Sequence, residues 1–189
     1  TYNGQLSSSS ILNRIDIMDR EEFLAAGGSD LGADTDWTEA VTRNAISQIH
    51  NIAASGGFNN TTFRISANIR EKEGIVINTG FEQFNSRANI STRALNDKLK
   101  VDFNASFTQR QSSFGNPLVL KYATLFNPTA PIYTAGSPFF PGDSGDVIGG
   151  YFETFGLFDS FNPVSIAEQH EQTGERMELN YNLSLGYDL

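Results

Sequence analysis

The sequence predicts an all-β fold, a partial transmembrane antiparallel β-barrel of about six long strands with short periplasmic turns and long extracellular loops that carry short helices. Three observations predict it. Several segments alternate between apolar and polar residues almost without a break, which is the signal of a strand. These segments are about 10–12 residues long, whereas strands of soluble proteins average about 5–6. Short connections alternate with long ones, as they do in outer-membrane barrels.

The first part of the chain predicts one weak strand, over residues 1–9, followed by two short helices. A capping box and a terminal glycine pair mark the first helix, and an acidic cap before a tryptophan marks the second. The helices are expected over residues 19–28, with Asp19 as N-cap and Glu22 three residues later, and over residues 34–44, with Asp34 or Thr35 near the N-cap.

Five strands with strong alternation follow. Along one of them, Phe63 and Ile65 share one face while Arg64 and Asn68 share the other. A strand that crosses a membrane at a tilt needs about 9–11 residues, and its backbone groups must pair with neighbouring strands because lipid offers no hydrogen bonds. The five strands are expected over residues 46–57, 61–70, 81–92, 99–110 and 177–189.

The connections differ strongly in length. Residues 58–60 and 93–98 form short turns, residues 71–80 an intermediate connection, and residues 10–45 and 111–176 long ones. In the longest connection, a Gly-Asn-Pro sequence ends the preceding strand. A helix-like stretch follows and ends in Asn-Pro-Thr-Ala-Pro. A loop of this length is unusual inside a compact soluble domain, but it is expected on the outer side of a barrel.

Composition excludes several function classes. The chain has 189 residues, enough for one domain, with a net charge of -9 and 15 Phe. A nucleic-acid partner is not expected, because such proteins present a basic surface. There is no cysteine, so disulfide frameworks and cysteine metal sites are excluded. The chain opens and stops inside apparent strands, and we therefore expect it to be a piece of a longer protein.

Some short motifs suggest chemistry, but each has a simpler interpretation. The Gly-Asp-Ser-Gly sequence at 142–145 matches a serine-protease tetrapeptide, yet neither His50 nor His170 has a supporting motif. Acidic loop residues suggest calcium, and Glu71 with Glu73 suggests paired glycosidase carboxylates. Turns, helix caps and solvated loop acids explain these residues better, so we expect no enzyme, no catalytic residue, no cofactor and no metal site. The calcium candidates are Asp30, Asp34 and Asp36, and Asp143, Asp146 and Glu153.

Candidate contact residues fall into two sets. The first lies on the polar faces of the strands, where Arg and Asn side chains offer directional hydrogen bonds to a ligand or to packed protein. The second comprises aromatic residues of the longest connection, which stack on sugar rings or anchor interfaces. The polar set is Arg64, Asn68, Arg70, Arg87, Asn89, Asp102, Asn104 and Arg110. The residues expected to contact substrate or partner are Arg64, Asn68, Arg87, Asn104, Tyr122, Phe126, Tyr133, Phe139, Phe140 and Tyr151.

Two alternatives remain open on the strand pattern. Alternating strands also build soluble sandwiches that have one face in a core and one in water. The chain would then be a secreted or surface carbohydrate-binding module that uses its aromatic loop. A fragment of a structural adhesin is a third interpretation. Strand length and the asymmetry of the connections favour the barrel.

The order and spacing of several segments resemble a known family. They are "DTDW" before a short helix, "HNIAASGG", "NNTTFRISANIREKEGIV", "NTGFEQFNSRANI", "LNDKLKVDFNASF" and "YATLFNPTAPIY". Together they resemble the SusC/RagA-type TonB-dependent outer-membrane transporters of Bacteroidetes. The similarity covers most of residues 11–133 and, more weakly, the last strand.

This resemblance implies a role in nutrient uptake. Residues 1–189 would be the N-terminal part of the transporter barrel after the plug, and residues 111–176 a long extracellular loop within it. The transporter would be a receptor in the cell outer membrane that imports glycans, or else peptides, with a SusD-like surface lipoprotein as partner. TonB would supply energy through an N-terminal part that this chain lacks, and membrane lipid would surround the strands.

Overall fold

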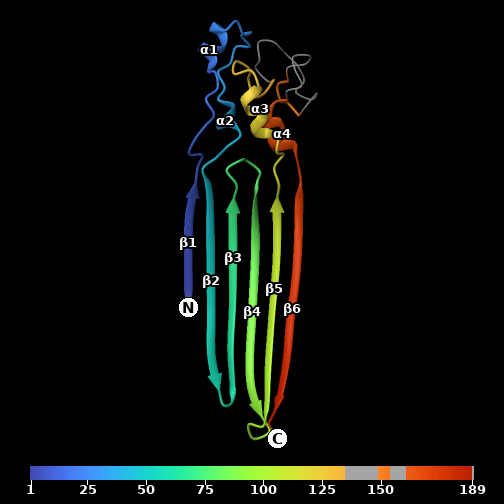
Figure 1. The fold of residues 1–189 in the computed structure, drawn as a ribbon. Helices are drawn as coiled ribbons and strands as arrows, with labels where there is room; N and C mark the ends of the chain where they lie inside the picture. The colour runs from blue at the N-terminus through green and yellow to red at the C-terminus, as the bar shows by residue number, and fades with distance from the viewer. Residues whose placement is uncertain (135–148, 154–160, 189) are drawn as a thin grey trace.

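The computed structural model describes residues 1–134, 149–153 and 161–188. It contains one six-stranded sheet in which every strand is antiparallel to its sequence neighbours, in the order β1-β2-β3-β4-β5-β6 (Figure 1). The strands are β1 Tyr2–Ser9, β2 Ala45–Phe58, β3 Thr61–Glu73, β4 Gly80–Ala94, β5 Leu99–Ser113 and β6 Thr173–Tyr187. The helices are α1 Arg20–Ala25, α2 Trp37–Ala40, α3 Val119–Leu125 and α4 Pro163–Gln169.

These elements confirm the predicted fold class and refine its boundaries. β2 to β6 are 13 to 15 residues long, so they extend beyond the predicted spans. The largest shift is in β6, which begins at Thr173 and not at residue 177. Its first residues are mostly polar or charged and lack an apolar pattern, but they pair with the end of β5. The capping box of α1 is present as predicted, whereas the N-cap of α2 is Asp36 and neither Asp34 nor Thr35.

Helix α4 was not predicted. Its N-cap is Asn162, whose side chain accepts hydrogen bonds from the first backbone N–H groups, and Pro163 occupies the first turn. Asn followed by Pro is a recognisable helix start, so the signal was present in the sequence. It was obscured because the helix has only 7 residues.

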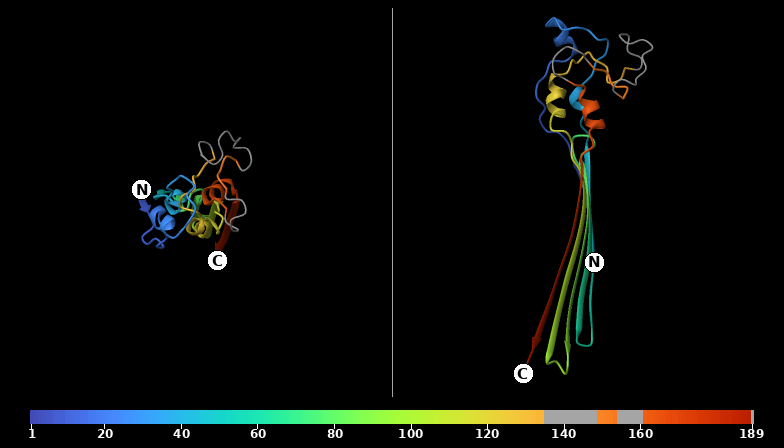
Figure 2. Two further views of the ribbon diagram at one scale, coloured as in Figure 1. Left: turned by 90° about the horizontal axis from the view of Figure 1, so that it is seen from above. Right: turned by 90° about the vertical axis from the view of Figure 1, so that its right-hand side faces the viewer.

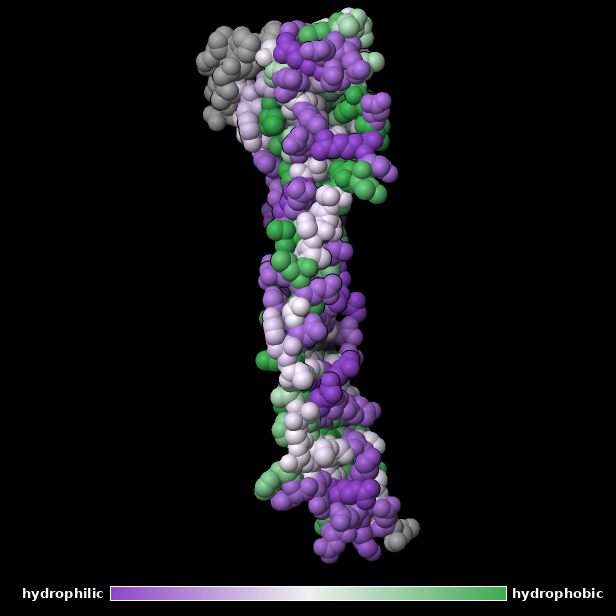
Figure 3. Space-filling view, turned by 90° about the vertical axis from the view of Figure 1, so that its left-hand side faces the viewer, coloured by the Kyte–Doolittle hydropathy of each residue, from purple (hydrophilic) through white to green (hydrophobic). Residues whose placement is uncertain are grey.

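The sheet has two chemically different faces. Because the register runs without a break from β2 to β6, residues opposite one another share a face over the whole width. We call the face that contains Arg64, Asn89 and Asn104 the polar face, and the opposite one, which contains Phe63, Ile90 and Phe103, the apolar face. Seen from the β1 side, hydrophobic residues gather along one margin of the sheet and hydrophilic residues along the other (Figure 3).

The apolar face is exposed over its full area. Leu179, Tyr181 and Leu185 on β6 are 67%, 76% and 64% exposed. A continuous apolar surface of this size is not stable against water, and it is what a strand presents to lipid. A row of Glu71, Glu82 and Glu175 borders this apolar surface on the side nearest the helices.

The helices and connections form a separate packed unit at one end of the sheet (Figures 1 and 2). We call this unit, built from residues 10–44, 74–79 and the described part of 114–172, the cap. Its core consists of Trp37, Val41, Val119, Ala123, Phe126, Ala130, Phe152, Val164 and Ala167. At the other end of the sheet only two tight turns connect the strands, and Asn60 of one donates to Asp97 of the other at 2.7 Å.

The described residues form this one sheet and no second one, so the β-sandwich alternative lacks its partner layer. Among the same residues, no helix is both long enough and apolar enough to cross a bilayer.

Candidate functional site

A ladder of side-chain amides crosses the middle of the polar face. Asn68 donates to Asn51 at 2.6 Å, Asn85 donates to Asn68 at 2.9 Å, and Thr108 donates to Asn85 at 3.0 Å. These residues are directly opposite one another on four successive strands. The ladder thus uses about half of the hydrogen-bonding capacity of its three amides within the sheet.

Two arginines lie beside the ladder without a partner. Arg64 on β3 and Arg87 on β4 are both exposed, and within the described part of the chain neither makes a hydrogen bond or an ion pair. They line one concave region of about 610 Å³ together with the ladder. Asn89 and Asn104 lie next to them, directly opposite each other on β4 and β5.

The structure therefore brings the four polar candidates together on one face. Of these, Asn68 is committed to the ladder, while Arg64, Arg87 and Asn104 keep their side-chain groups available. Arg70, Asp102 and Arg110 share the same face. Their role in binding stays a prediction.

The aromatic candidates divide differently. Tyr122 and Phe126 are buried in the cap, where Phe126 meets the edge of Trp37 with ring centres 4.9 Å apart. Tyr133 is 49% exposed and lies against Tyr151 at 5.2 Å between ring centres. Phe139 and Phe140 lie outside the described residues. Packing within the cap accounts for Tyr122 and Phe126, and this leaves Tyr133 and Tyr151 as the described aromatic candidates.

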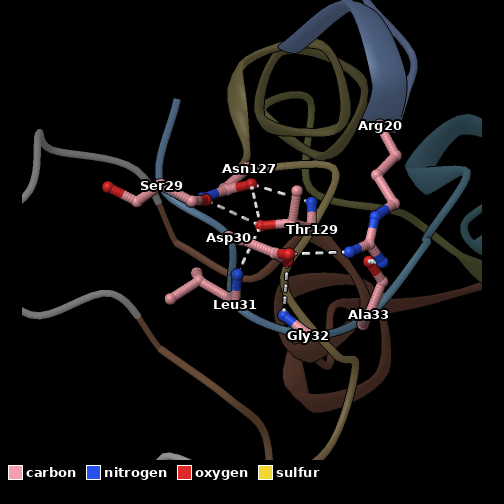
Figure 4. Close-up of polar contacts among 8 residues, drawn as sticks. All are labelled: Arg20, Ser29, Asp30, Leu31, Gly32, Ala33, Asn127 and Thr129. Carbon is pink, nitrogen blue, oxygen red and sulfur yellow. Dashed lines mark hydrogen bonds and ion pairs between the residues drawn. The ribbon is translucent and has the colours of Figure 1, made fainter. Parts of the chain in front are cut away.

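Polar contacts made by a few side chains join the two long connections of the cap (Figure 4). The hydroxyl of Thr129 accepts from the N–H of Leu31 at 2.8 Å and lies 2.9 Å from the carbonyl oxygen of Ser29. Arg20 forms an ion pair with Asp30 at 2.7 Å and donates to the carbonyl of Ala33 at 2.9 Å. The Asn-Pro-Thr-Ala sequence at residues 127–130 thus hydrogen-bonds to the segment that precedes α2.

Ion pairs and hydrogen bonds within the cap account for several acids that the sequence suggested as calcium ligands. Asp30 pairs with Arg20, and Asp36 caps α2 and pairs with Arg14 at 2.7 Å. Glu153 accepts from the backbone N–H of Asn162 at 2.9 Å. Within the described residues there is no cluster of His, Asp and Glu suited to a metal ion. Residues 142–146 lie outside the described residues.

Asn162 organises the second half of the cap. It is fully buried, and its side chain accepts from the N–H groups of Val164 and Ser165 at 3.0 and 3.2 Å. Its amide group donates to the carbonyls of Ile132 and Phe152, each at 2.9 Å. One side chain therefore caps α4 and ties it to two other segments.

We expect Asn162→Ala to destabilise the cap by about 2 kcal/mol, because it removes a helix cap and the two amide hydrogen bonds to the carbonyls of Ile132 and Phe152. The measurement is hydrogen exchange of the α4 amides in the full-length protein in membrane. Asn162→Ser is the matched control, since its hydroxyl keeps a helix-cap acceptor while the amide donors are lost, and it should have a smaller effect. Unchanged exchange in the alanine variant would contradict this role.

Burial raises the pKa of Glu153 above the usual value of a glutamate, and the hydrogen bond from Asn162 offsets this only in part. The neighbouring Tyr151 has a pKa raised to about 12 by burial and by its hydrogen bond to Glu168. Tyr151 is thus a neutral donor at physiological pH. The ionised form of Glu153 therefore destabilises the folded cap.

This shift sets the sign of a pH effect. A carboxyl whose pKa is higher in the folded state binds more protons there, so stability is greatest below the unfolded pKa of 4.5 and falls as pH rises through the folded value. We expect protection of residues 161–170 from exchange, corrected for the intrinsic rate, to fall over this window. Glu153→Gln should remove the dependence, and a dependence that persists would assign it to another group.

No family model matches the chain. It is 28% identical over 172 residues to the TonB-dependent receptor SusC of Bacteroides thetaiotaomicron, which covers 86% of this chain and 17% of SusC. It is 29% identical over 163 residues to the TonB-dependent receptor P3 of Formosa agariphila, covering 77% of this chain and 16% of P3. The chain is a relative of the TonB-dependent receptors.

A third relative is the TonB-dependent receptor P26 of Formosa agariphila, which is 34% identical over 103 residues, or 52% of this chain and 10% of P26. These matches confirm the predicted resemblance to TonB-dependent receptors, and they place the chain in the outer membrane. The open, strictly antiparallel sheet is the corresponding part of a transmembrane β-barrel. The chain spans only 10–17% of the length of these relatives.

Proposed function

We propose that this chain is the wall segment of an active importer of the outer membrane that takes up glycans, with peptides as the second cargo class. The observation that supports it is the two-faced sheet. Its apolar face suits lipid, and its polar face offers unpaired arginines and amides to a solute in the barrel interior. Sequence similarity to TonB-dependent receptors favours energy transfer through TonB over passive diffusion.

The cap would then lie outside the cell. Long connections face the exterior in such barrels, and short turns face the periplasm. The cap collects both long connections at one end, whereas the turn around Asn96 closes the other end. Together with the exposed Tyr133 and Tyr151, the cap is the surface that we propose to meet a SusD-like lipoprotein.

Surface labelling tests this orientation. The chain has no cysteine, so single substitutions report one position within it. Leu12→Cys lies on the cap at a residue that is 93% exposed, and Asn96→Cys lies in a tight turn at the opposite end. With a membrane-impermeant maleimide, we expect Leu12→Cys to react in intact cells and Asn96→Cys to react only after the outer membrane is opened. The reverse pattern would overturn the proposed orientation.

Import is tested by deletion of the full reading frame. We expect the deletion strain to lose growth on at least one oligosaccharide of a panel and to lose uptake of its fluorescent derivative. A protonophore should abolish the same uptake in wild-type cells, because the energy comes from the inner membrane. Selective loss of peptide uptake would transfer the proposal to the second cargo class. Wild-type growth on every substrate, with uptake indifferent to the protonophore, would reject active import.

A further inference from the structure

Charge is strongly segregated in this chain. Its net charge is -9, yet most of its 13 Lys and Arg residues lie on the polar face of the sheet, where Asp102 and Glu178 are the opposing strand acids. The cap and the border of the apolar face carry many of the acids. The cations of the polar face are Arg64, Arg70, Lys72, Arg87, Arg93, Lys100, Arg110 and Arg176.

Local contacts neutralise the two acids of this face. Asp102 pairs with Lys100 at 3.0 Å, and Glu178 pairs with Arg176 at 2.6 Å. Arg110 is held over the ring of Phe81, 3.9 Å from its centre. The acids therefore cannot compensate the arginines in the middle of the face.

The amides of the ladder are engaged in part. Asn68 donates to Asn51 and accepts from Asn85, so two of the four hydrogen bonds that its amide can make are used within the sheet. The remaining neutral groups would bind sugar hydroxyls, whereas an anion would gain stronger, charge-assisted bonds from arginine. The strongest recognition groups that remain available in this region are the guanidinium groups of Arg64 and Arg87.

These two arginines are close neighbours. Arg64 is opposite Asn89, and Arg87 is opposite Ser66, so they are one row apart on adjacent strands. Residues in this diagonal relation are about 7–8 Å apart, which is within the reach of long side chains. An anion between the two guanidinium groups would relieve their mutual repulsion while accepting bidentate hydrogen bonds.

We propose that Arg64 and Arg87 form a binding site for the anionic groups, carboxylate or sulfate, of an acidic oligosaccharide. Asn89 and Asn104, which line the adjoining concave region with Arg87, would bind the hydroxyls beside the charge. This proposal rests on the proposed import function and narrows its cargo to the acidic class. An acidic protein surface seated on the same face is the competing occupant.

The test uses two probes that differ only in charge. The full-length receptor in detergent is titrated with fluorescent dextran oligomers and with dextran sulfate oligomers of the same length. We expect tighter binding of the sulfated probe, weakened by salt because screening acts on the charged contact. Arg64→Gln and Arg87→Gln should each weaken that binding about tenfold, as expected for the loss of a charged hydrogen bond. Lys98→Gln removes an exposed cation of the turn between β4 and β5, outside the polar face; it is the control and should bind like the wild type.

The other outcomes each decide the question. Equal affinity for both probes, or loss of binding in the Lys98 variant alone, would overturn the anionic site. A lower unfolding temperature in the Arg64 and Arg87 variants with unchanged probe binding would also overturn it, in favour of an acidic protein surface. The uptake defect of the deletion strain is measured separately and does not depend on these results. Failure of the anionic site is therefore distinguishable from failure of the import function.

Discussion

Trp37→Ala is expected to destabilise the cap by about 3–5 kcal/mol, the usual cost of truncating a buried aromatic side chain. Trp37 is 1% exposed and belongs to the cluster that joins α2, α3 and α4. Its indole N–H donates to the carbonyl of Asn127 at 2.8 Å, and its ring meets Phe126. The substitution therefore leaves a cavity and removes one of the two hydrogen bonds to the carbonyl of Asn127.

Hydrogen exchange of the full-length protein in membrane measures this effect. Protection should fall in residues 29–44, 119–130 and 161–170, while β3 to β5 keep theirs. Leu12→Ala is the control, because that side chain is 93% exposed and its loss should change nothing. Trp37→Phe keeps a ring but removes the donor, and we expect a loss of about 1–3 kcal/mol. If the alanine variant lost protection no more than the control, the cap would not depend on this core.

A charge on the apolar face is expected to have the second large effect. Ala105→Arg places a guanidinium midway along the exposed apolar rows, where Ala105 is opposite Ala88 and Tyr181. At the middle of a bilayer this costs about 2–4 kcal/mol. Asn182→Arg is the comparison, since it adds the same side chain to the polar face on the neighbouring strand, where Asn182 is opposite the neutral Asn104.

We expect Ala105→Arg to reduce the yield of folded full-length protein in the membrane, measured by heat modifiability on gels and by urea unfolding in vesicles. Asn182→Arg should leave both close to wild type. Equal losses in the two variants would show that the faces do not meet different solvents. Loss only in Asn182→Arg would reverse the assignment of lipid and interior.

Strand structure was readable from the sequence because its cause is local. The alternation that placed Phe63 and Arg64 on opposite faces follows from strand geometry alone, and the structure has the same assignment. Strand ends were less readable. The first residues of β6 are polar or charged, and only pairing with β5 makes them a strand.

The cap was less predictable because its contacts join distant segments. Tyr122 and Phe126 were expected to be available aromatics, but nothing near them in sequence indicates that Trp37 covers Phe126. The same limit applies to the polar face. Sequence alternation identified Asn68 and Arg87 as equals, whereas in the structure only the asparagine is hydrogen-bonded to its neighbours among the described residues.

The cap also has a consequence for the order in which the protein folds. Its decisive contacts join residues about a hundred positions apart, such as Leu31 with Thr129, so closing them from an extended chain carries a large loop-closure entropy. The hairpins from β2 to β5 each form between sequence neighbours, and once paired they bring the two long connections to the same end. Strand pairing should therefore come first and cap closure last, and a defect in the cap would leave a barrel wall that is already assembled.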